Sequence, residues 1–194
     1  MKVLVACEYS GTVRDAFIKR GHDALSCDLL PTESPGPHYQ GDVFDIIDSE
    51  KWDLMIAHPP WTHLAVSGAA WFAEKRKDGR QQAGIDFFMK LANADIPKIC
   101  IENPVCIMST VWRKPDQYIQ PYDFGHLEQK KTGLWLKWLP KLIPTHNGFF
   151  KMMELPKNQR ERLHYLPPGP ERAKLRSKTF PGIAAAMAEQ WGTS

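Results

Sequence analysis

The sequence predicts an α/β fold, built on a doubly wound and mostly parallel sheet, in a single domain covering residues 1–194. Short hydrophobic runs alternate with stretches of helical apolar spacing through the first half of the chain. Gly and Pro residues follow these runs, as expected where strands lead into turns. Of the 194 residues, 43% are hydrophobic, which is enough for one sizeable core. Strands that alternate with helices are typical of a parallel sheet.

Local patterns place the individual elements. Strand-like runs occupy 3–7, 22–27, 39–43 (a short strand or turn), 52–57, 97–101 and 132–138. Helical apolar spacing occupies 12–20, 79–94 and 183–190. Residues 140–178 are rich in Pro, Lys and Arg with little periodicity, and predict an irregular, partly mobile segment inserted before the last helix. Four tryptophans are predicted to pack in the core: Trp71, Trp112, Trp138 and Trp191.

Composition excludes some classes of protein. No apolar run approaches the ~20 residues that span a bilayer, and the first strand is too short for a signal sequence. The four cysteines show no CxxC pair and no accompanying His spacing, which predicts free thiols and no metal site. We therefore expect a cytoplasmic protein.

The net charge of +3 is unevenly distributed along the chain. Residues 1–128 carry 13 Lys/Arg against 18 Asp/Glu, whereas residues 129–178 carry 12 against 3. This basic stretch favours a nucleic-acid partner, although Lys-rich loops are also commonly just solvated. The candidate nucleic-acid-binding residues are Lys130, Lys131, Arg160, Arg162, Arg172, Lys174, Arg176 and Lys178.

The most informative motif is His58-Pro59-Pro60-Trp61, directly after the strand-like run 52–57. Two consecutive prolines fix φ and supply no N–H, so they force a rigid loop at the strand end. In an open α/β sheet, ligands bind at the carboxyl ends of strands. Backbone carbonyls and an aromatic face at this point suit a planar substrate. Trp61 is then either a stacking platform or a core aromatic that plugs the pocket.

A second motif follows the first predicted strand. Cys7-Glu8-Tyr9-Ser10-Gly11 forms a glycine turn that leads into a helix, and Asp28 ends the second strand. Glycine allows close approach of a ligand to the backbone, and an acid at this place can accept from ribose hydroxyls. Since there is no GxGxxG, a single adenosine-type cofactor is favoured over a dinucleotide. Asp42 could accept from an adenine amino group, although turn and capping roles explain both aspartates equally well.

Seven segments occur in an order that resembles a known family: 8–11, the acid at 28, 41–43, 58–61, 102–104, 129–136 and 179–191. They are similar to S-adenosylmethionine-dependent DNA cytosine C5 methyltransferases, nearest to the small phage-type members, over all but about 140–175. The resemblance implies a Rossmann-like class I methyltransferase fold, S-adenosylmethionine as the cofactor and DNA as the partner. It also implies that Glu102 contacts cytosine, although an acid that caps the following helix explains Glu102 about as well.

The family nucleophile is a cysteine, and the resemblance aligns it with Trp61. C5 attack requires covalent addition at C6, which an indole cannot perform. The loop instead resembles the (Asp/Asn/Ser)-Pro-Pro-aromatic motif of amino-methyltransferases. There the first residue and the next backbone carbonyl accept from the amine, and the aromatic ring stacks on the extruded base. His58 is the departure from that motif, and His63 and Ser67 could line the same pocket.

The sequence thus predicts methylation of an exocyclic amine on a DNA base, cytosine N4 before adenine N6. The catalytic candidates are His58, Pro59, Pro60, Trp61 and Glu102. Two alternatives stay open: an inactive relative that binds DNA or nucleotide, and a C5 enzyme whose cysteine was replaced. The substrate is duplex DNA, single-stranded DNA or a free nucleotide. Because the long recognition region of larger family members has only 140–175 as its counterpart, specificity would be low or come from a homodimer or another partner.

Overall fold

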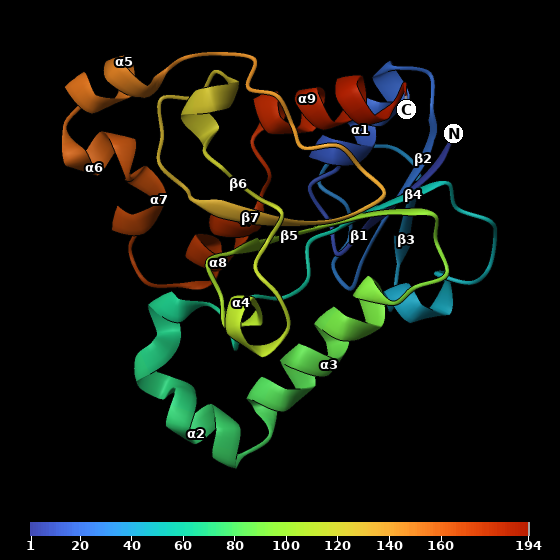
Figure 1. Cartoon of the computed structure of the whole chain (residues 1–194), viewed down its shortest axis with the longest axis horizontal. Helices are drawn as coiled ribbons and strands as arrows, with labels where there is room; N and C mark the ends of the chain where they lie inside the picture. The colour runs from blue at the N-terminus through green and yellow to red at the C-terminus, as the bar shows by residue number, and fades with distance from the viewer. Residues whose placement is uncertain (194) are drawn as a thin grey trace.

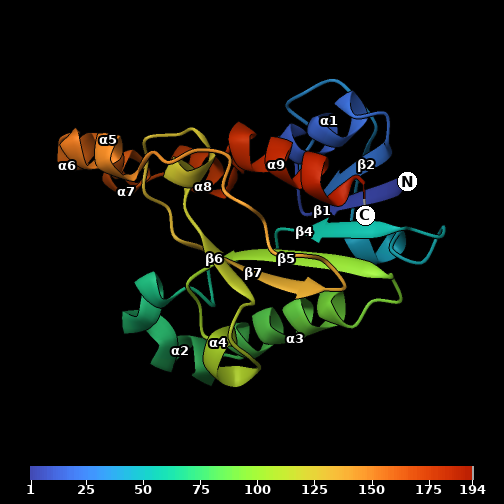
Figure 2. The ribbon, with the colours of Figure 1, turned by 45° about the horizontal axis from the view of Figure 1, so that its top comes forward.

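The computed structural model describes residues 1–193, which contain a seven-stranded sheet in the order β3-β2-β1-β4-β5-β7-β6. Strands β1 to β5 pair in parallel, and β7 runs antiparallel to both β5 and β6. Helices cover both faces, with α1 and α9 on one and α2, α3 and α4 on the other (Figures 1 and 2). The predicted doubly wound, Rossmann-like sheet is therefore confirmed.

The elements have the following bounds within the described chain. The strands are β1 (Lys2–Ala6), β2 (Asp23–Asp28), β3 (His38–Gln40), β4 (Leu54–Ala57), β5 (Lys98–Pro104), β6 (Gln117–Ile119) and β7 (Thr132–Lys137). The α-helices are α1 (Thr12–Lys19), α2 (Phe72–Lys77), α3 (Arg80–Ala92), α4 (Met108–Val111), α5 (Phe149–Glu154), α6 (Lys157–Arg160), α7 (Arg162–Tyr165), α8 (Pro170–Ser177) and α9 (Pro181–Trp191). The 3₁₀ helices are η1 (Val43–Asp45), η2 (Val66–Trp71) and η3 (Pro121–Phe124).

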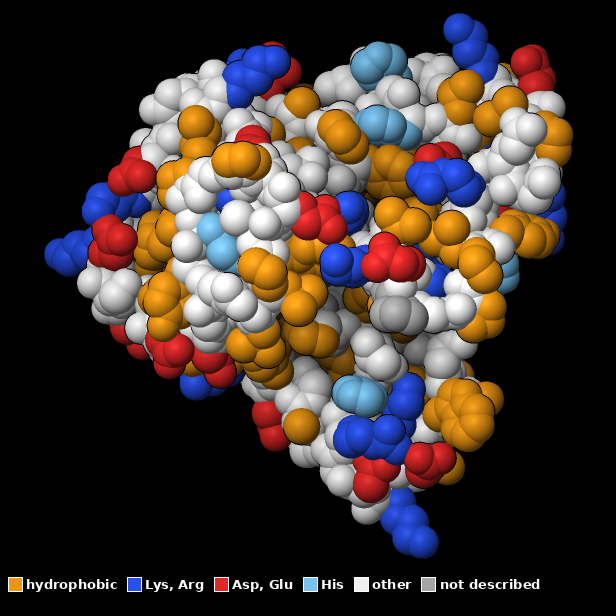
Figure 3. Space-filling model, turned by 180° about the vertical axis from the view of Figure 1, so that it is seen from behind, with side chains coloured by type: hydrophobic (Ala, Val, Ile, Leu, Met, Phe, Trp, Pro, Cys, Tyr) orange, Lys and Arg blue, Asp and Glu red, His pale blue; other side chains and the backbone are white. Residues whose placement is uncertain are grey.

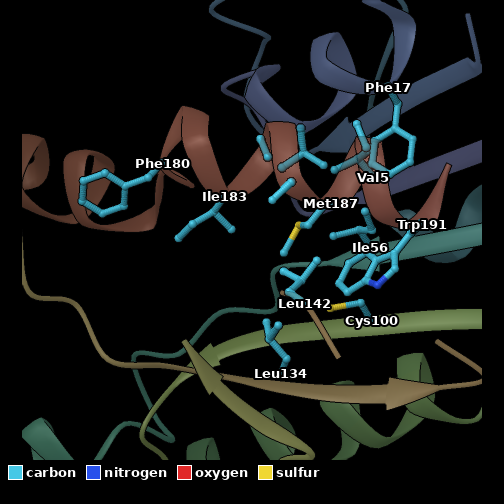
Figure 4. Close-up of a cluster of buried hydrophobic side chains, with 14 of the residues drawn as sticks. Val5, Phe17, Ile56, Cys100, Leu134, Leu142, Phe180, Ile183, Met187 and Trp191 are labelled. Atoms are coloured by element: carbon cyan, nitrogen blue, oxygen red, sulfur yellow. The ribbon is translucent and has the colours of Figure 1, made fainter. Parts of the chain in front are cut away.

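The main core lies between α9 and the sheet. Ile183, Met187 and Trp191 recur every four residues, so they share one helix face, and Figure 4 shows them directed toward the sheet. They pack in one buried cluster with Ile56 of β4 and Cys100 of β5. Each fully buried side chain of this kind contributes about 1.5–3 kcal/mol to stability. This packing fixes the C-terminal helix against the central strands.

The order of the strands creates one switch point. The chain runs from β1 outward to β2 and β3, then returns to place β4 on the other side of β1. Ligands of open α/β sheets bind beyond the carboxyl ends of the strands at such a point. Figure 2 shows β4 and β5 pointing toward the side of the molecule that holds α7 and α8. The turn after β1 and the loop after β4 therefore meet where a ligand is expected.

One expectation about the chain was wrong, and two further elements were missed. The segment 140–178 is not irregular, because it contains α5, α6, α7 and α8. These helices have four to eight residues, too short for a clear apolar period to mark them in the sequence. Three-residue β6 and the α2 helix were likewise not predicted.

The four tryptophans predicted as core residues do not behave alike. Trp191 is fully buried, but Trp71 and Trp138 are 63% and 84% exposed, and Trp112 is 37% exposed. Trp138 directly follows β7 and has a left-handed φ of 53°, which interrupts the strand geometry. Its side chain is therefore exposed, unlike those of Leu134 and Trp135 in the strand. Hydrophobicity alone does not bury a residue at the end of an element. Among residues 1–193, no helix combines the length and apolar character needed to cross a membrane.

Candidate functional site

The turn between β1 and α1 is built around the carboxylate of Glu8. Its two oxygens accept from the backbone N–H groups of Val13 and Arg14, at 2.7 and 3.2 Å, and Ser10 Oγ donates to it at 3.1 Å. Gly11 adopts a left-handed φ of 74°, which glycine tolerates without strain. A helix N-terminus is the usual place for a bound phosphate. Here Glu8 already occupies it, so this site suits a nucleoside ligand without a pyrophosphate.

A cavity of about 130 Å³ opens beside this turn, and we call it the switch-point cavity. It is lined by Cys7, Cys27, Asp28, Leu29, Gly41, Asp42, Val43, Pro60 and Phe87. The structure thus brings together the ends of β1, β2 and β4, as the sequence indicated. Of the other predicted cofactor residues, Tyr9 and Ser10 lie beside it around a void of about 10 Å³ that Cys7 also borders.

The two aspartates of the switch-point cavity also have local roles. Asp28 Oδ1 accepts from the backbone N–H of Leu30 at 2.9 Å, and Asp42 Oδ1 accepts from that of Phe44 at 3.0 Å. Burial raises the pKa of Asp28, with opposing effects from its backbone hydrogen bonds. Each carboxylate has a second oxygen, so turn formation and ligand binding are compatible.

On the expectation from the resemblance that S-adenosylmethionine is the cofactor, Asp28→Asn should weaken binding of S-adenosylhomocysteine about 10- to 100-fold while leaving the fold intact. The amide keeps an oxygen for the Leu30 N–H but loses the charge-assisted acceptor for a ribose hydroxyl, worth about 1.5–3 kcal/mol. Titration calorimetry measures the change. Asp45→Asn, just outside the cavity lining, is the control. Unchanged affinity in Asp28→Asn would remove this carboxylate from the site.

The loop after β4 separates two cavities. Pro60 lines the switch-point cavity, whereas the next residue, Trp61, lines a second cavity of about 230 Å³ that we call the Trp61 cavity. The Trp61 cavity is lined by Trp61, Val66, Ser67, Pro104, Val105, Gln129, Lys130, Lys131, Leu163, His164 and Arg176. Ser67 is thus part of this lining, while His63 is not. Consecutive residues of this loop thus line both cavities.

His58 and Glu102 form a buried pair. His58 Nδ1 lies 2.8 Å from Glu102 Oε2, and the two side chains are only 10% and 8% exposed. Burial alone would lower the pKa of His58 and raise that of Glu102, but the pairing outweighs it in both. The pKa of His58 is raised, and that of Glu102 falls to about 2, with help from Lys130 and Thr179. Glu102 therefore stays ionised at neutral pH.

The pair leaves one polar atom without a partner. His58 donates through Nδ1 to Glu102, so the neutral ring carries its lone pair on Nε2. Nε2 is buried and has no hydrogen-bond partner among residues 1–193. Unsatisfied buried polar atoms are uncommon in folded proteins and call for an explanation. When the ring is neutral, this nitrogen can accept a proton or a hydrogen bond; His58 borders the void of about 10 Å³ beside Tyr9 and Ser10 and does not line the Trp61 cavity.

Two residues that were not predicted as site residues hold this arrangement. Thr179 Oγ1 donates to Glu102 Oε2 at 3.0 Å, and Asn103 Nδ2 donates to the backbone carbonyl of Pro59 at 3.1 Å. Asn103 directly follows Glu102, and Thr179 belongs to the segment 179–191 that carries the family resemblance. These two positions in the sequence were the signals that could have identified Asn103 and Thr179 as site residues. Their contacts span 44 and 77 residues, which no local pattern encodes.

None of the four thiols is suited to act as a nucleophile. Burial raises the pKa of Cys27 to about 12 and that of Cys106 to about 11, and it raises those of Cys7 and Cys100 as well. The carboxylate of Asp28 adds to the effect at Cys7. A thiolate, not a thiol, adds to a base. No cysteine belongs to the lining of the Trp61 cavity in the described structure.

Some of the predicted nucleic-acid-binding residues have acidic partners. Lys174 and Lys178 both pair with Glu33, and Arg162 pairs with Glu128 at 3.0 Å. Seen from behind, Lys and Arg side chains are interspersed with acidic and hydrophobic ones (Figure 3). No continuous basic surface is visible among the described residues on that face.

Three of the remaining basic residues border the Trp61 cavity, and two make hydrogen bonds to backbone carbonyls. Lys131 and Arg176 line it, and Lys130 also borders it while its Nζ donates to a backbone carbonyl just after α8. Burial lowers the pKa of Lys130. Arg160 and Arg172 each donate to a backbone carbonyl, at 3.2 and 3.0 Å. The eight predicted nucleic-acid-binding residues thus have three different environments: ion pairs with Glu33 or Glu128, the lining of the Trp61 cavity, and hydrogen bonds to backbone carbonyls.

Fold and site define a Rossmann-like α/β protein with two cavities lined by consecutive residues of one loop. No protein-family model matches the chain, and no curated protein matches it. Among solved structures, it is similar to an E. coli prophage protein provisionally described as a DNA modification methyltransferase, with 15% identity and a TM-score of 0.47. The match covers 70% of this chain and 46% of that one. This chain thus spans less than half the length of that protein.

Proposed function

We propose that the protein is an S-adenosylmethionine-dependent methyltransferase that modifies an exocyclic amine of a DNA base, cytosine N4 before adenine N6. The observation that carries the proposal is the loop after β4. Pro60 borders the switch-point cavity and Trp61 borders the Trp61 cavity, so a donor and an acceptor held in them would meet at this loop.

The residues of the switch-point cavity fit this cofactor. Asp28 and Asp42 can accept from hydroxyl and amino groups of an adenosine, and Glu8 excludes a pyrophosphate from the helix N-terminus. When bound, S-adenosylmethionine supplies an electrophilic methyl group on a sulfonium centre. Tyr9 and Ser10 would border its amino-acid end, next to the void near His58.

The residues around the loop supply what amine methylation needs. Trp61 would stack on the base in the Trp61 cavity. His58 borders the void beside Tyr9 and Ser10 and not the Trp61 cavity, so the amine would be directed past the loop toward His58 Nε2, which would accept its hydrogen bond. The amine nitrogen forms a bond to the methyl carbon as the carbon–sulfur bond breaks, and the amine proton leaves to His58 or water. No thiolate is required, in keeping with four thiols whose pKa values are raised.

A non-catalytic binding protein is the second candidate, favoured by one observation. The guanidinium of Arg176 lies 4.8 Å from the centre of the Trp61 ring and so covers part of the surface where a base would stack. Asn103 also already donates to the Pro59 carbonyl. A carbonyl accepts two hydrogen bonds and an arginine side chain is flexible, so neither contact blocks catalysis.

Incubation with methyl-labelled S-adenosylmethionine and mixed DNA, followed by digestion and nucleoside mass spectrometry, tests the proposal. We expect label in N4-methyldeoxycytidine or, less abundantly, in N6-methyldeoxyadenosine. Label at cytosine C5 would contradict the chemistry proposed for Trp61. Absence of label in both single- and double-stranded DNA, with cofactor binding confirmed by calorimetry, would favour the binding protein.

A further inference from the structure

The basic residues of α8, together with Lys178, which directly follows it, fall into two pairs with different partners. Lys174 Nζ and Lys178 Nζ, four residues apart, both pair with the carboxylate of Glu33. Tyr9 donates its hydroxyl to the backbone carbonyl of Lys174 at 2.6 Å, which fixes this side of α8 to the turn after β1. These two lysines therefore have their charges balanced within the protein.

The other basic pair, Arg172 and Arg176 of α8, has no acidic partner among residues 1–193. Arg172 and Arg176 are also four residues apart, so their side chains share one helix face. Arg176 lines the Trp61 cavity, and Arg172 donates to the backbone carbonyl of His164, which lines it too. The described lining contains Lys130 and Lys131 but no Asp or Glu. This cavity thus has a concentration of positive charge at one wall.

Two further observations indicate that the charges of Arg172 and Arg176 would be stabilised by a bound anion. The pKa of Arg176 is lowered by burial and by the neighbouring charge of Arg172. Arg172 Nε is buried and has no hydrogen-bond partner among the described residues. Like charges four residues apart slightly destabilise a helix, and an anion bound between the two arginines would offset this repulsion. An arginine pair matches phosphate oxygens in both charge and geometry.

We propose that Arg172 and Arg176 bind a phosphate group next to the base held in the Trp61 cavity, so that the substrate is a nucleotide unit and not a nucleoside. The inference rests on the proposed function, since it assigns the group adjacent to the reacting base. Arg176 would move from the Trp61 ring to the phosphate, and the ring would become free for the base. The phosphate comes either from a DNA backbone or from a free nucleotide.

Binding measurements without cofactor test this site. We expect dCMP, or a cytosine-containing single-stranded oligonucleotide, to bind at least tenfold more tightly than deoxycytidine. Arg172→Gln/Arg176→Gln should weaken the phosphate-bearing ligand about 10- to 100-fold without weakening deoxycytidine, because Arg176 no longer covers the ring on which the base stacks. Arg172→Lys/Arg176→Lys, which keeps both charges, should retain most of the preference. If dCMP shows the effect, a free nucleotide suffices; if only the oligonucleotide does, the phosphate belongs to DNA.

The matched control removes two charges elsewhere in the same segment. Lys151 and Lys157 are exposed on α5 and α6, and Lys151→Gln/Lys157→Gln should leave both affinities within threefold of wild type. Equal weakening in the control and arginine variants, or equal binding of deoxycytidine and the phosphate-bearing ligands, would overturn the site. Labelled product in the mass-spectrometry assay with no phosphate preference would overturn this inference alone. Phosphate preference without any methylated product would instead overturn the proposed function.

Discussion

Trp61→Ala is expected to reduce amine methylation about 100-fold or more. Stacking of a base on an aromatic ring contributes about 1–3 kcal/mol, and loss of the ring also removes the surface that holds the amine in line. Arg176 would lose its contact with the ring, 4.8 Å from its centre, and fill part of the vacated space. Labelled methyl transfer to DNA, measured under single-turnover conditions, gives the change in rate.

Three further variants show whether the loss of activity in Trp61→Ala is due to the loss of stacking. Trp61→Phe keeps a flat ring and should retain activity within about tenfold of wild type. Trp138→Ala removes a tryptophan that is 84% exposed after β7 and should leave the rate unchanged. Trp61→Cys tests the C5 alternative, since a new thiol in the cavity that yielded 5-methylcytosine would identify a C5 enzyme whose cysteine was replaced. Full activity in Trp61→Ala would rule out stacking on this ring.

Glu102→Gln is expected to lower the methylation rate by about 10²- to 10⁴-fold and to shift its pH dependence. In wild type, activity should rise with pH through the raised pKa of His58, because the protonated ring has no lone pair left to accept from the amine. Without the carboxylate, burial lowers the pKa of His58, so the acidic limb should move to lower pH. A series of kcat measurements from pH 5 to pH 9 records both effects.

Two variants separate a titrating role of His58 from a structural one. His58→Asn keeps an acceptor that does not titrate, so the acidic limb should disappear while part of the activity remains. Glu50→Gln, which removes a carboxylate paired with Lys2 at the exposed start of β1, should leave the profile as in wild type. An unshifted acidic limb in Glu102→Gln would show that His58 does not set the pH dependence.

The His58–Glu102 pair also predicts how the free energy of unfolding changes with pH. The pKa of Glu102 is depressed to about 2, so its contribution is present above the ordinary value of 4.5 and is lost as pH falls toward 2. The pKa of His58 is raised, so its contribution is present below 6.5 and is lost as pH rises through the raised value. The difference in unfolding free energy between wild type and Glu102→Gln should therefore be largest between pH 4.5 and 6.5. Urea unfolding across this range measures it.

The sequence by itself determined the α/β class and most elements of the sheet. Strands and helices in the first half are encoded by periods of two and 3.6 residues, which are local properties. The glycine turn, Asp28 and the Pro-Pro loop were located because parallel strands end at one edge of a sheet. The same locality explains why four short helices within 140–178 were missed.

The tertiary structure decided which of these residues meet. Only the fold places His58 against Glu102, leaves its Nε2 without a partner, and brings Arg176 onto Trp61. No local pattern could show that Lys174 and Lys178 pair with Glu33 whereas Arg176 lines the Trp61 cavity. Contacts between residues more than forty positions apart depend on how whole layers pack, and a pattern that repeats every two or four residues carries no information about them.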